Sequence, residues 1–488
     1  MTLQPGQGQG IGKAPLLFVF APVFLSLVLS AEGLGPLTAG SVAFLACLGG
    51  IFLFSGARPP RFLSFSLLIA LTASVFSILS VYRIQAFELP PGTMSDEGEV
   101  ILERPWGTKR AVIVEGKAGR FLLKVPPDQT VPEGQCISFT GEPASFRESP
   151  GSSFREGLYW RARGVTAEIV PVKTGLKRVQ LPGLPSFRTA LRKKILLGLP
   201  PATRGYLLAA LLGASDPALA SDHRSWGTSH LLAVSGFHVG LAAAAAWKLF
   251  SLAFFRRRLS VRGRAALVSG FVWAYALLAG GAPSAIRAAL MIQSVLLGQA
   301  MGRKGGPVNG VALAGLILLL WRPEWYADLG WRLSVTAALL LAALAERGRG
   351  WKTALAACPL VWLATFPLSA GAFGAVPLSG LLVNFLALPV FTLLYPLAAG
   401  ASLPALLGLP GGYYFAGAAE GLFIIWGWTA DGLAALAPWA LSWSWGASFA
   451  GLSAFFTVVT LGLYPLGIRT LGAAALLASA AAVLLGPS

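Results

Sequence analysis

The chain has 488 residues, of which 55% are hydrophobic and only 12% charged, and its formal net charge is +18. A soluble domain could not cover that much apolar surface with so few ions, so the composition excludes an ordinary soluble globular protein. Cys47, Cys136 and Cys358 lie far apart without ligand spacing, which argues against a disulfide framework and a zinc site. We predict a polytopic α-helical membrane protein that needs no metal or cofactor.

Three apolar segments open the chain, at Pro15 to Ser30, Leu37 to Ser55 and Phe62 to Val81. Arg58 and Arg61 lie between the second and third segments, and basic loops stay on the cytoplasmic side. Residues 1–85 are therefore predicted to be an N-terminal domain of about three transmembrane helices with a cytoplasmic N-terminus. Three crossings place the sequence that follows outside the cytoplasm.

Residues 86–180 have the pattern of a small β-barrel. Short β-type runs alternate there with Gly and Pro breakers, as expected of a barrel. These runs are Arg110 to Glu115, Gly119 to Val125, Cys136 to Gly141 and Gly164 to Val170. The length fits a five-stranded OB-like barrel inserted between helical domains and located outside the cytoplasm.

Residues 181–229 are predicted to form amphipathic helices that lie along the membrane surface, because arginines and lysines are interspersed among apolar residues from Leu181 to Pro200. Residues 230–488 form a second block of apolar spans. Basic loops fall there at alternate crossings, which satisfies the positive-inside rule with one orientation. We therefore expect a multi-pass protein of a bacterial inner membrane.

The stretch from Ser225 to Leu241 places polar groups in an apolar helix, where they cost free energy unless they are partnered or wetted. Helical spacing puts His230 and His238 on one side, while Gly236 and Gly240 form a GxxxG pattern that permits close helix contact. Ser235 lies between these histidines. Two interpretations stay open, a tight helix crossing with its hydroxyls bonded to backbone, and a polar lining or hinge.

Two later stretches also carry charge within apolar sequence. Arg287 follows a break at Gly280, Gly281 and Pro283, so its guanidinium either snorkels to the interface or faces a cavity. Asp328 and Arg332 are four residues apart among aromatic residues, an arrangement that allows a local ion pair beside an interfacial aromatic belt.

These stretches, in this order, resemble the ComEC family of inner-membrane channels that admit transforming DNA. The resemblance is close at HLLAVSGFHVGL, good at YALLAGGAPSAIRAALM, and looser at PVNGVALAGLILLLWRPEWYADLGWRLS and LSGLLVNFLALPV. The segment SPGSSFREGLYWRARGV resembles the end of that family's barrel-like module. The resemblance implies a channel for single-stranded DNA, with an OB-like module outside that meets the strand. The channel and signature positions considered are His230, Ser235, Gly236, His238, Arg287, Asp328, Arg332 and Asn384.

The sequence departs from many members of that family, which carry a C-terminal nuclease domain resembling metallo-β-lactamases. Such a domain needs a cluster of histidine and aspartate ligands, and the only histidines here are His223, His230 and His238. We therefore expect a channel without its own nuclease and without catalytic residues. Other competence proteins are expected partners: a DNA receptor, a cytoplasmic motor or helicase, and a separate nuclease.

Basic and aromatic residues alternate at the end of the barrel module, an arrangement typical of single-strand binding, where bases stack on rings and arginines follow phosphates. The residues considered for DNA binding are Arg147, Arg155, Tyr159, Trp160, Arg161 and Arg163. Helical spacing in this stretch favours equally an interpretation in which Tyr159 and Trp160 are barrel core or face the bilayer.

Two other functions compete with the DNA channel. One is transport of another envelope polymer or lipid on the same scaffold, because fold does not settle cargo. The other is an intramembrane serine hydrolase with Ser235 as nucleophile and a histidine as base. Ser235 and His238 are only three residues apart and no orienting acid is visible, so the hydrolase is the weaker alternative.

Overall fold

The computed structural model describes residues 16–30, 35–55, 60–85, 92–129, 131–146, 156–180, 183–214, 216–301, 306–347 and 350–442. These residues form two compact units, each built from separated stretches of the chain. The first unit uses Met1–Phe87 and Gln293–Leu368, and the second uses Glu88–Ile292 and Ser369–Ser444. The limits predicted from the sequence follow chain order instead, and they stay predictions.

The first unit contains the three N-terminal helices that the apolar segments indicated. They are α1 (Leu17–Ser30), α2 (Pro36–Ser55) and α3 (Pro60–Gln85). Later in the chain come α12 (Pro307–Trp321), the 3₁₀ turn η2 (Pro323–Ala327) and α13 (Leu329–Arg347). Arg83 of α3 donates to the carbonyl oxygens of Leu320 and Trp321 at 2.6 and 3.1 Å, where the C-terminal dipole of α12 favours a cation. This contact joins α3 to α12.

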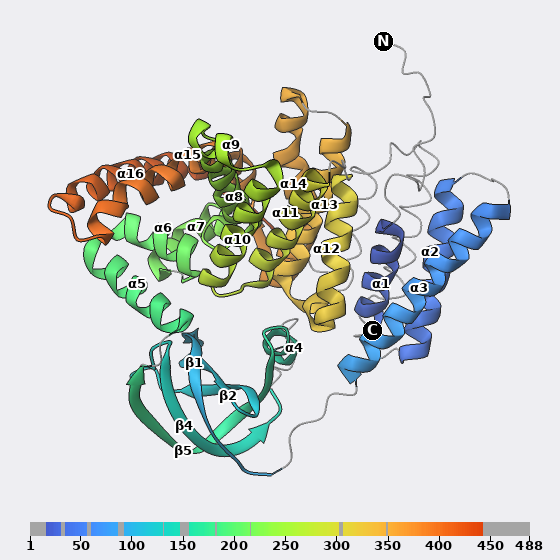
Figure 1. Cartoon of the computed structure of the whole chain (residues 1–488), viewed down its shortest axis with the longest axis horizontal. Coiled ribbons are helices and arrows are strands. Elements are labelled where there is room, and N and C mark those ends of the chain that lie inside the picture. The colour runs from blue at the N-terminus through green and yellow to red at the C-terminus, as the bar shows by residue number, and fades with distance from the viewer. Residues whose placement is uncertain are drawn as a thin grey trace. The chain divides into compact units, whose positions relative to one another are not determined.

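The second unit begins with a closed five-stranded barrel (Figure 1). Its strands are β1 (Met94–Trp106), β2 (Lys109–Gly116), β3 (Gly119–Val125), β4 (Gln135–Ala144) and β5 (Val165–Gln180), with α4 (Glu156–Arg161) before β5. The strand order around the barrel is β1-β2-β3-β5-β4, with β3 and β5 parallel and the other neighbours antiparallel. The predicted barrel is therefore present as a closed mixed sheet.

Apolar side chains fill the barrel because alternate residues of each strand point inward. Val112, Val114, Phe121 and Leu123 are fully buried in one cluster. A β-carbon on Gly98 would lie 2.5 Å from the carbonyl oxygen of Glu115, so the strands approach there closely enough to require glycine.

Helices follow the barrel in the second unit. They are α5 (Leu184–Gly198), α6 (Pro201–Leu212), α7 (Pro217–Ser225), the 3₁₀ turn η1 (Ser229–Leu231), α8 (Gly236–Phe250), α9 (Ala253–Arg258), α10 (Val261–Leu278) and the start of α11 (Pro283–Ala300). After α14 (Trp351–Phe373) come β6 (Ala375–Pro377), α15 (Ser379–Leu406), α16 (Gly412–Leu436) and β7 (Ala440–Ser442). The core of this region stacks Tyr206 of α6 on Phe423 of α16, with ring centroids 4.1 Å apart.

Arg188 of α5 connects the barrel to the helices of the second unit. Its side chain is about 7% exposed and forms an ion pair with Glu133, a barrel residue, at 2.8 Å. The same guanidinium donates to the carbonyl oxygens of Leu212 and Leu278, at the C-terminal ends of α6 and α10. Each of these partners favours a cation, so burial of Arg188 is compensated.

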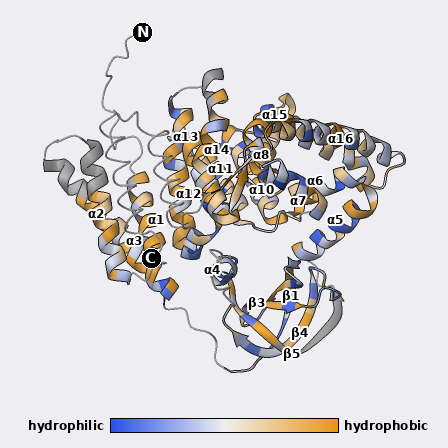
Figure 2. Ribbon diagram, turned by 180° about the vertical axis from the view of Figure 1, so that it is seen from behind, coloured by the Kyte–Doolittle hydropathy of each residue, from blue (hydrophilic) through white to orange (hydrophobic). Residues whose placement is uncertain are grey.

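Three helical stretches of the described chain are long and apolar enough to cross a membrane: Leu67–Gln85, Leu329–Glu346 and Ser379–Leu406. Shorter apolar stretches occur in α1, α2, α11, α12 and α14. Figure 2 shows that hydrophobic residues dominate helices such as α1 and α12, and large apolar side chains such as Leu393 and Trp428 are exposed. Apolar side chains exposed on the outside of helices are expected where the solvent is lipid.

Candidate functional site

The polar stretch at Ser225–Leu241 is not one continuous helix, so the predicted stacking of His230 and His238 on one helical side is wrong. Helix α7 ends at Ser225, the backbone is non-helical apart from the turn η1, and α8 begins only at Gly236. Gly227 has a φ of +69°, which ends the preceding helical geometry and favours glycine. The stretch is therefore a break between two helices, as the hinge interpretation allows.

Side chains that are distant in sequence form hydrogen bonds to the backbone of this break. Asn384 of α15 donates its amide to the carbonyl oxygen of Gly227 at 3.2 Å, and the Tyr395 hydroxyl donates to that of Leu231 at 2.7 Å. A β-carbon on Gly227 would lie 2.7 Å from the α-carbon of Gly380, so the break packs directly on α15. Hydrogen bonds that a helix would satisfy internally are thus satisfied from another helix.

His223 is a site residue that the sequence reasoning missed. It is fully buried, and its Nε2 lies 2.8 Å from the Tyr206 hydroxyl while its Nδ1 lies 2.8 Å from the Thr228 hydroxyl. These two contacts fix the start of the break.

All three histidines of the chain lie in or beside the break: His223 is near the end of α7, His230 is in η1, and His238 is in the first turn of α8. His230 is exposed, whereas His238 is 3% exposed. The Nδ1 of His238 accepts from the Ser235 backbone N–H at 3.4 Å and lies 3.1 Å from the Ser235 hydroxyl. Because a backbone N–H can only donate, the proton of His238 is on Nε2.

Arg287 lies against the beginning of α8. It is 2% exposed, and a β-carbon on Gly236 would be 3.4 Å from its Nη2. The snorkelling interpretation therefore does not describe this side chain. The GxxxG interpretation is also wrong in part, because a β-carbon on Gly240 would meet nothing within 4 Å.

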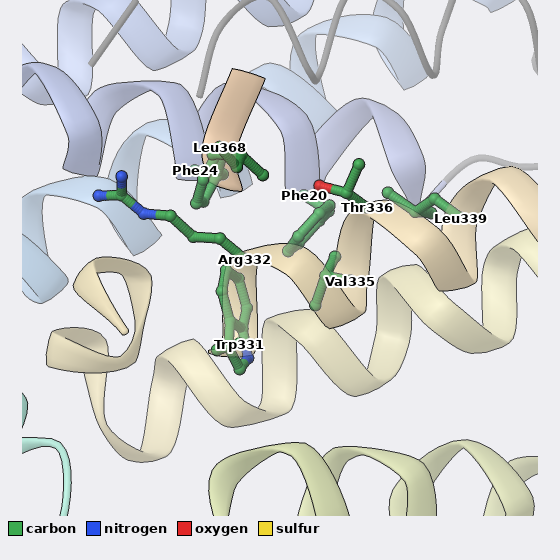
Figure 3. Close-up of a pocket in the computed structure, with 8 residues that line it drawn as sticks. All are labelled: Phe20, Phe24, Trp331, Arg332, Val335, Thr336, Leu339 and Leu368. Carbon is green, nitrogen blue, oxygen red and sulfur yellow. The ribbon is translucent and has the colours of Figure 1, made fainter. Parts of the chain in front are cut away.

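Asp328 and Arg332 belong to the first unit. Asp328 caps α13 by accepting from the Trp331 backbone N–H at 2.8 Å, as an N-cap aspartate does. Arg332 donates from Nε to the Tyr326 carbonyl oxygen and borders a small pocket with Phe24 and Trp331. Figure 3 shows its guanidinium directed away from Thr336 and Leu339 of the same pocket.

The predicted DNA-binding residues occupy the segment between β4 and β5. Arg147 and Arg155 lie outside the described residues. Trp160 is fully buried, and its indole N–H donates to Glu156 at 2.9 Å, which favours the barrel-core interpretation for this ring. Tyr159, Arg161 and Arg163 are partly exposed.

The aromatic rings of this segment are in contact with arginines of the chain itself. The Arg163 guanidinium carbon lies 3.6 Å from the Tyr159 ring centroid, and that of Arg104 lies 5.0 to 5.1 Å from the rings of Trp106, Tyr159 and Trp160. Tyr159 therefore offers a stacking surface only together with Arg163.

Ser235 is the candidate nucleophile at the helix break, and His238 is its candidate base. Ser235 and His238 contact each other, but the Nε2 of His238 has no hydrogen-bond partner, so no carboxylate orients the imidazole. Among the described residues, no group of three or more His, Cys, Asp or Glu side chains is placed to hold a metal ion.

Comparison with known proteins gives a consistent result. Residues 211–469 match a family model described as Competence protein. The chain is 29% identical over 203 residues to ComE operon protein 3 of Bacillus subtilis, covering 40% of the chain and 25% of that relative. It is also 29% identical over 281 residues to Recombination protein 2 of Haemophilus influenzae, covering 52% of the chain and 34% of that relative. The chain thus spans about a quarter and about a third of the length of these two relatives, and no solved structure matches it.

Proposed function

The chain belongs to the competence protein family, and from that membership we propose that it is an inner-membrane channel that passes single-stranded DNA into the cytoplasm during natural transformation. The observation that carries the proposal is the broken segment between α7 and α8. Non-helical backbone at membrane depth is tolerated only where protein buries it or where it lines a water-filled cavity. The break itself contains the exposed His230, and the buried cation Arg287 of α11 lies beside the first residue of α8; a polyanion needs such polar and cationic groups along its path.

The barrel is proposed to be an OB-like module outside the cytoplasm that meets the strand first. In OB-folds the loop between the fourth and fifth strands takes part in binding, and Tyr159, Arg161 and Arg163 lie between β4 and β5. The closed five-strand order supports this assignment. Arg188 then connects this module to the helices, so that a strand captured outside is held close to the channel.

The orientation in this proposal follows from the positive-inside pattern, and the partners follow from the family. The N-terminus is cytoplasmic, several helices cross the bacterial inner membrane, and other competence proteins supply the DNA receptor, the motor or helicase, and the nuclease. Arg287, His230, Ser235, Gly236, His238 and Asn384 are the proposed channel residues of the second unit, and Asp328 and Arg332 those of the first.

The direct test is uptake of labelled DNA by an intact strain, its deletion mutant and the complemented mutant. We expect the deletion to abolish import and the gene in trans to restore it. A deletion that imports DNA normally contradicts the proposal. A deletion that changes envelope composition while import stays normal would instead favour transport of another envelope polymer or lipid.

One observation favours the hydrolase alternative, the 3.1 Å contact between Ser235 and His238. Ser235→Ala separates the two functions. We expect this variant to retain at least about a tenth of wild-type import, because loss of one neutral hydrogen bond costs about 1 kcal/mol. A nucleophile would be irreplaceable, so complete loss of import with normal protein levels in the membrane would support the hydrolase.

A further inference from the structure

Two arginines are the buried cations of the described chain, and their surroundings differ. Arg188 has a carboxylate and two helix C-terminal carbonyl oxygens as partners. Arg287 has one long hydrogen bond, from Nη2 to the Ser284 carbonyl oxygen at 3.4 Å, and its Nε and Nη1 have no partner. A buried guanidinium without a partner is costly, so the site of Arg287 is incomplete without an anion.

The position of Arg287 at a helix N-terminus increases the free-energy cost of burying its charge without an anion. Its Nη2 faces Gly236, the first residue of α8, where the dipole of a 15-residue helix carries partial positive charge. A cation at this end of a helix is repelled, whereas an anion is attracted to both the helix end and the guanidinium. Arg188 shows the opposite arrangement, with its cation at two helix C-termini.

Backbone amides at this end of α8 add to the positive charge. The first intrahelical hydrogen bond runs from the Val239 N–H to the Ser235 carbonyl, and the Ser235 side chain accepts from the His238 amide, which leaves the amides of Gly236 and Phe237. The buried imidazole of His238 packs on Tyr395 of α15, with ring centroids 4.7 Å apart. The Arg287 guanidinium and these first helix amides together form a donor set of the kind that binds oxyanions.

Three carboxylates of the second unit, those of Glu420, Asp431 and Glu133, have partners other than Arg287. Glu420 of α16 accepts from the backbone N–H groups of Ala202 and Thr203 at 2.9 and 2.7 Å, and so caps α6. Asp431 accepts from the Trp226 indole at 2.8 Å, and Glu133 pairs with Arg188. At the N-terminus of α6, therefore, a carboxylate from a distant helix accepts the hydrogen bonds of the free backbone amides.

We propose that Arg287 and the first turn of α8 form a phosphate-binding site, whose ligand is a phosphodiester group of the DNA strand in transit. The identity of the ligand rests on the proposed channel function, whereas the phosphate chemistry rests on the donor set itself. The site holds one phosphate at a time by a limited set of contacts, which suits a polymer that must both enter and leave. His238 and Ser235 act as positioning residues at the edge of this site.

The test uses the purified full chain in nanodiscs of zwitterionic lipid, and it measures thermal unfolding against inorganic phosphate. We expect phosphate to raise the Tm of the wild type and to leave the Tm of Arg287→Gln unchanged. In phosphate-free buffer Arg287→Gln should unfold at or above the wild-type temperature, because an unpaired buried charge has been removed. Arg264→Gln, which removes the same charge from a half-buried position on α10, should respond to phosphate as the wild type does.

Either of two results overturns the proposal: Arg287→Gln that still responds to phosphate, or Arg287→Gln that is less stable than the wild type without phosphate. The second result would mean that Arg287 is satisfied inside the folded chain. Two glycine variants test the location of the site independently. Gly236→Val places atoms against the Arg287 guanidinium, whereas Gly240→Val places them in open space on the same helix. We expect about ten-fold or greater loss of phosphate affinity for Gly236→Val and none for Gly240→Val.

The source of the phosphate is decided by a second set of ligands, a short single-stranded oligonucleotide and the same sequence with an uncharged methylphosphonate backbone. We expect the charged strand to stabilise the wild type more than Arg287→Gln, and the uncharged strand to stabilise both equally. Stabilisation by inorganic phosphate without any effect of the charged strand would identify a free-phosphate site and overturn the assignment to DNA. A deletion strain with normal DNA import would refute the channel function alone, since phosphate binding is measured separately.

Discussion

Arg188→Ala is expected to destabilise the second unit by about 3 to 5 kcal/mol, because removing one partner of a buried ion pair leaves the other charge uncompensated. In this variant Glu133 would lose its cation, and the carbonyl oxygens of Leu212 and Leu278 would lose their donor. Because these partners belong to the barrel, α6 and α10, the damage should appear at the junction of barrel and helices. Thermal unfolding and limited proteolysis of the full chain in nanodiscs measure it.

Lys193→Ala is the matched control, since it removes a positive charge from an exposed position on the same helix. We expect this control to change stability by less than about 0.5 kcal/mol. A double variant, Arg188→Met with Glu133→Leu, should recover much of the lost stability, because no unpaired charge remains. Similar behaviour of Arg188→Ala and Lys193→Ala would show that the buried pair does not hold the junction.

Trp160→Ala is expected to destabilise the barrel by about 3 to 5 kcal/mol, the usual cost of removing a large buried aromatic ring. Trp160 is 0% exposed, packs on Trp106 with ring centroids 4.7 Å apart, and donates to Glu156. Glu156 also accepts from the Trp106 indole at 3.0 Å and pairs with Lys124 at 2.9 Å, so the ring supports a wider network. Loss of Trp160 should therefore lower the Tm of the full chain.

Tyr159→Ala is the comparison for Trp160→Ala, because Tyr159 is partly exposed on the same short helix. We expect it to cost about 1 kcal/mol of stability through its contact with Arg163, and to weaken single-strand binding by about ten-fold. A Trp160→Ala protein with unchanged Tm and strongly weakened DNA binding would reverse these roles. It would place the base-stacking surface on Trp160.

The barrel was largely predictable from the sequence, because inward and outward residues alternate along its strands. The four β-type runs correspond to β2, β3, β4 and β5. The sequence pattern missed β1, whose first half contains Asp96, Glu97 and Glu99 and so lacks an apolar alternation. That half is held by pairing with β4, which local composition does not report.

The geometry of the candidate site was less predictable, because distant residues determine it. The sequence from Ser225 to Leu241 allows a helix, and its break depends on Asn384 and Tyr395, which follow about 150 residues later in the chain. His223 was missed because its partner Tyr206 lies on another helix. Arg287 was singled out by a signal that does survive in sequence, an arginine one turn inside an apolar helix after a Gly-Gly-Ala-Pro break.

The most direct test of the channel is the reactivity of position 230 toward a membrane-impermeant thiol reagent. The protein would carry His230→Cys after Cys47, Cys136 and Cys358 are replaced by alanine, and Leu231→Cys would be the control at a fully buried neighbour. We predict rapid labelling at 230, slower labelling when single-stranded DNA is bound, and none at 231. If position 230 stays unlabelled with and without DNA, no aqueous path reaches the break and the channel proposal is contradicted.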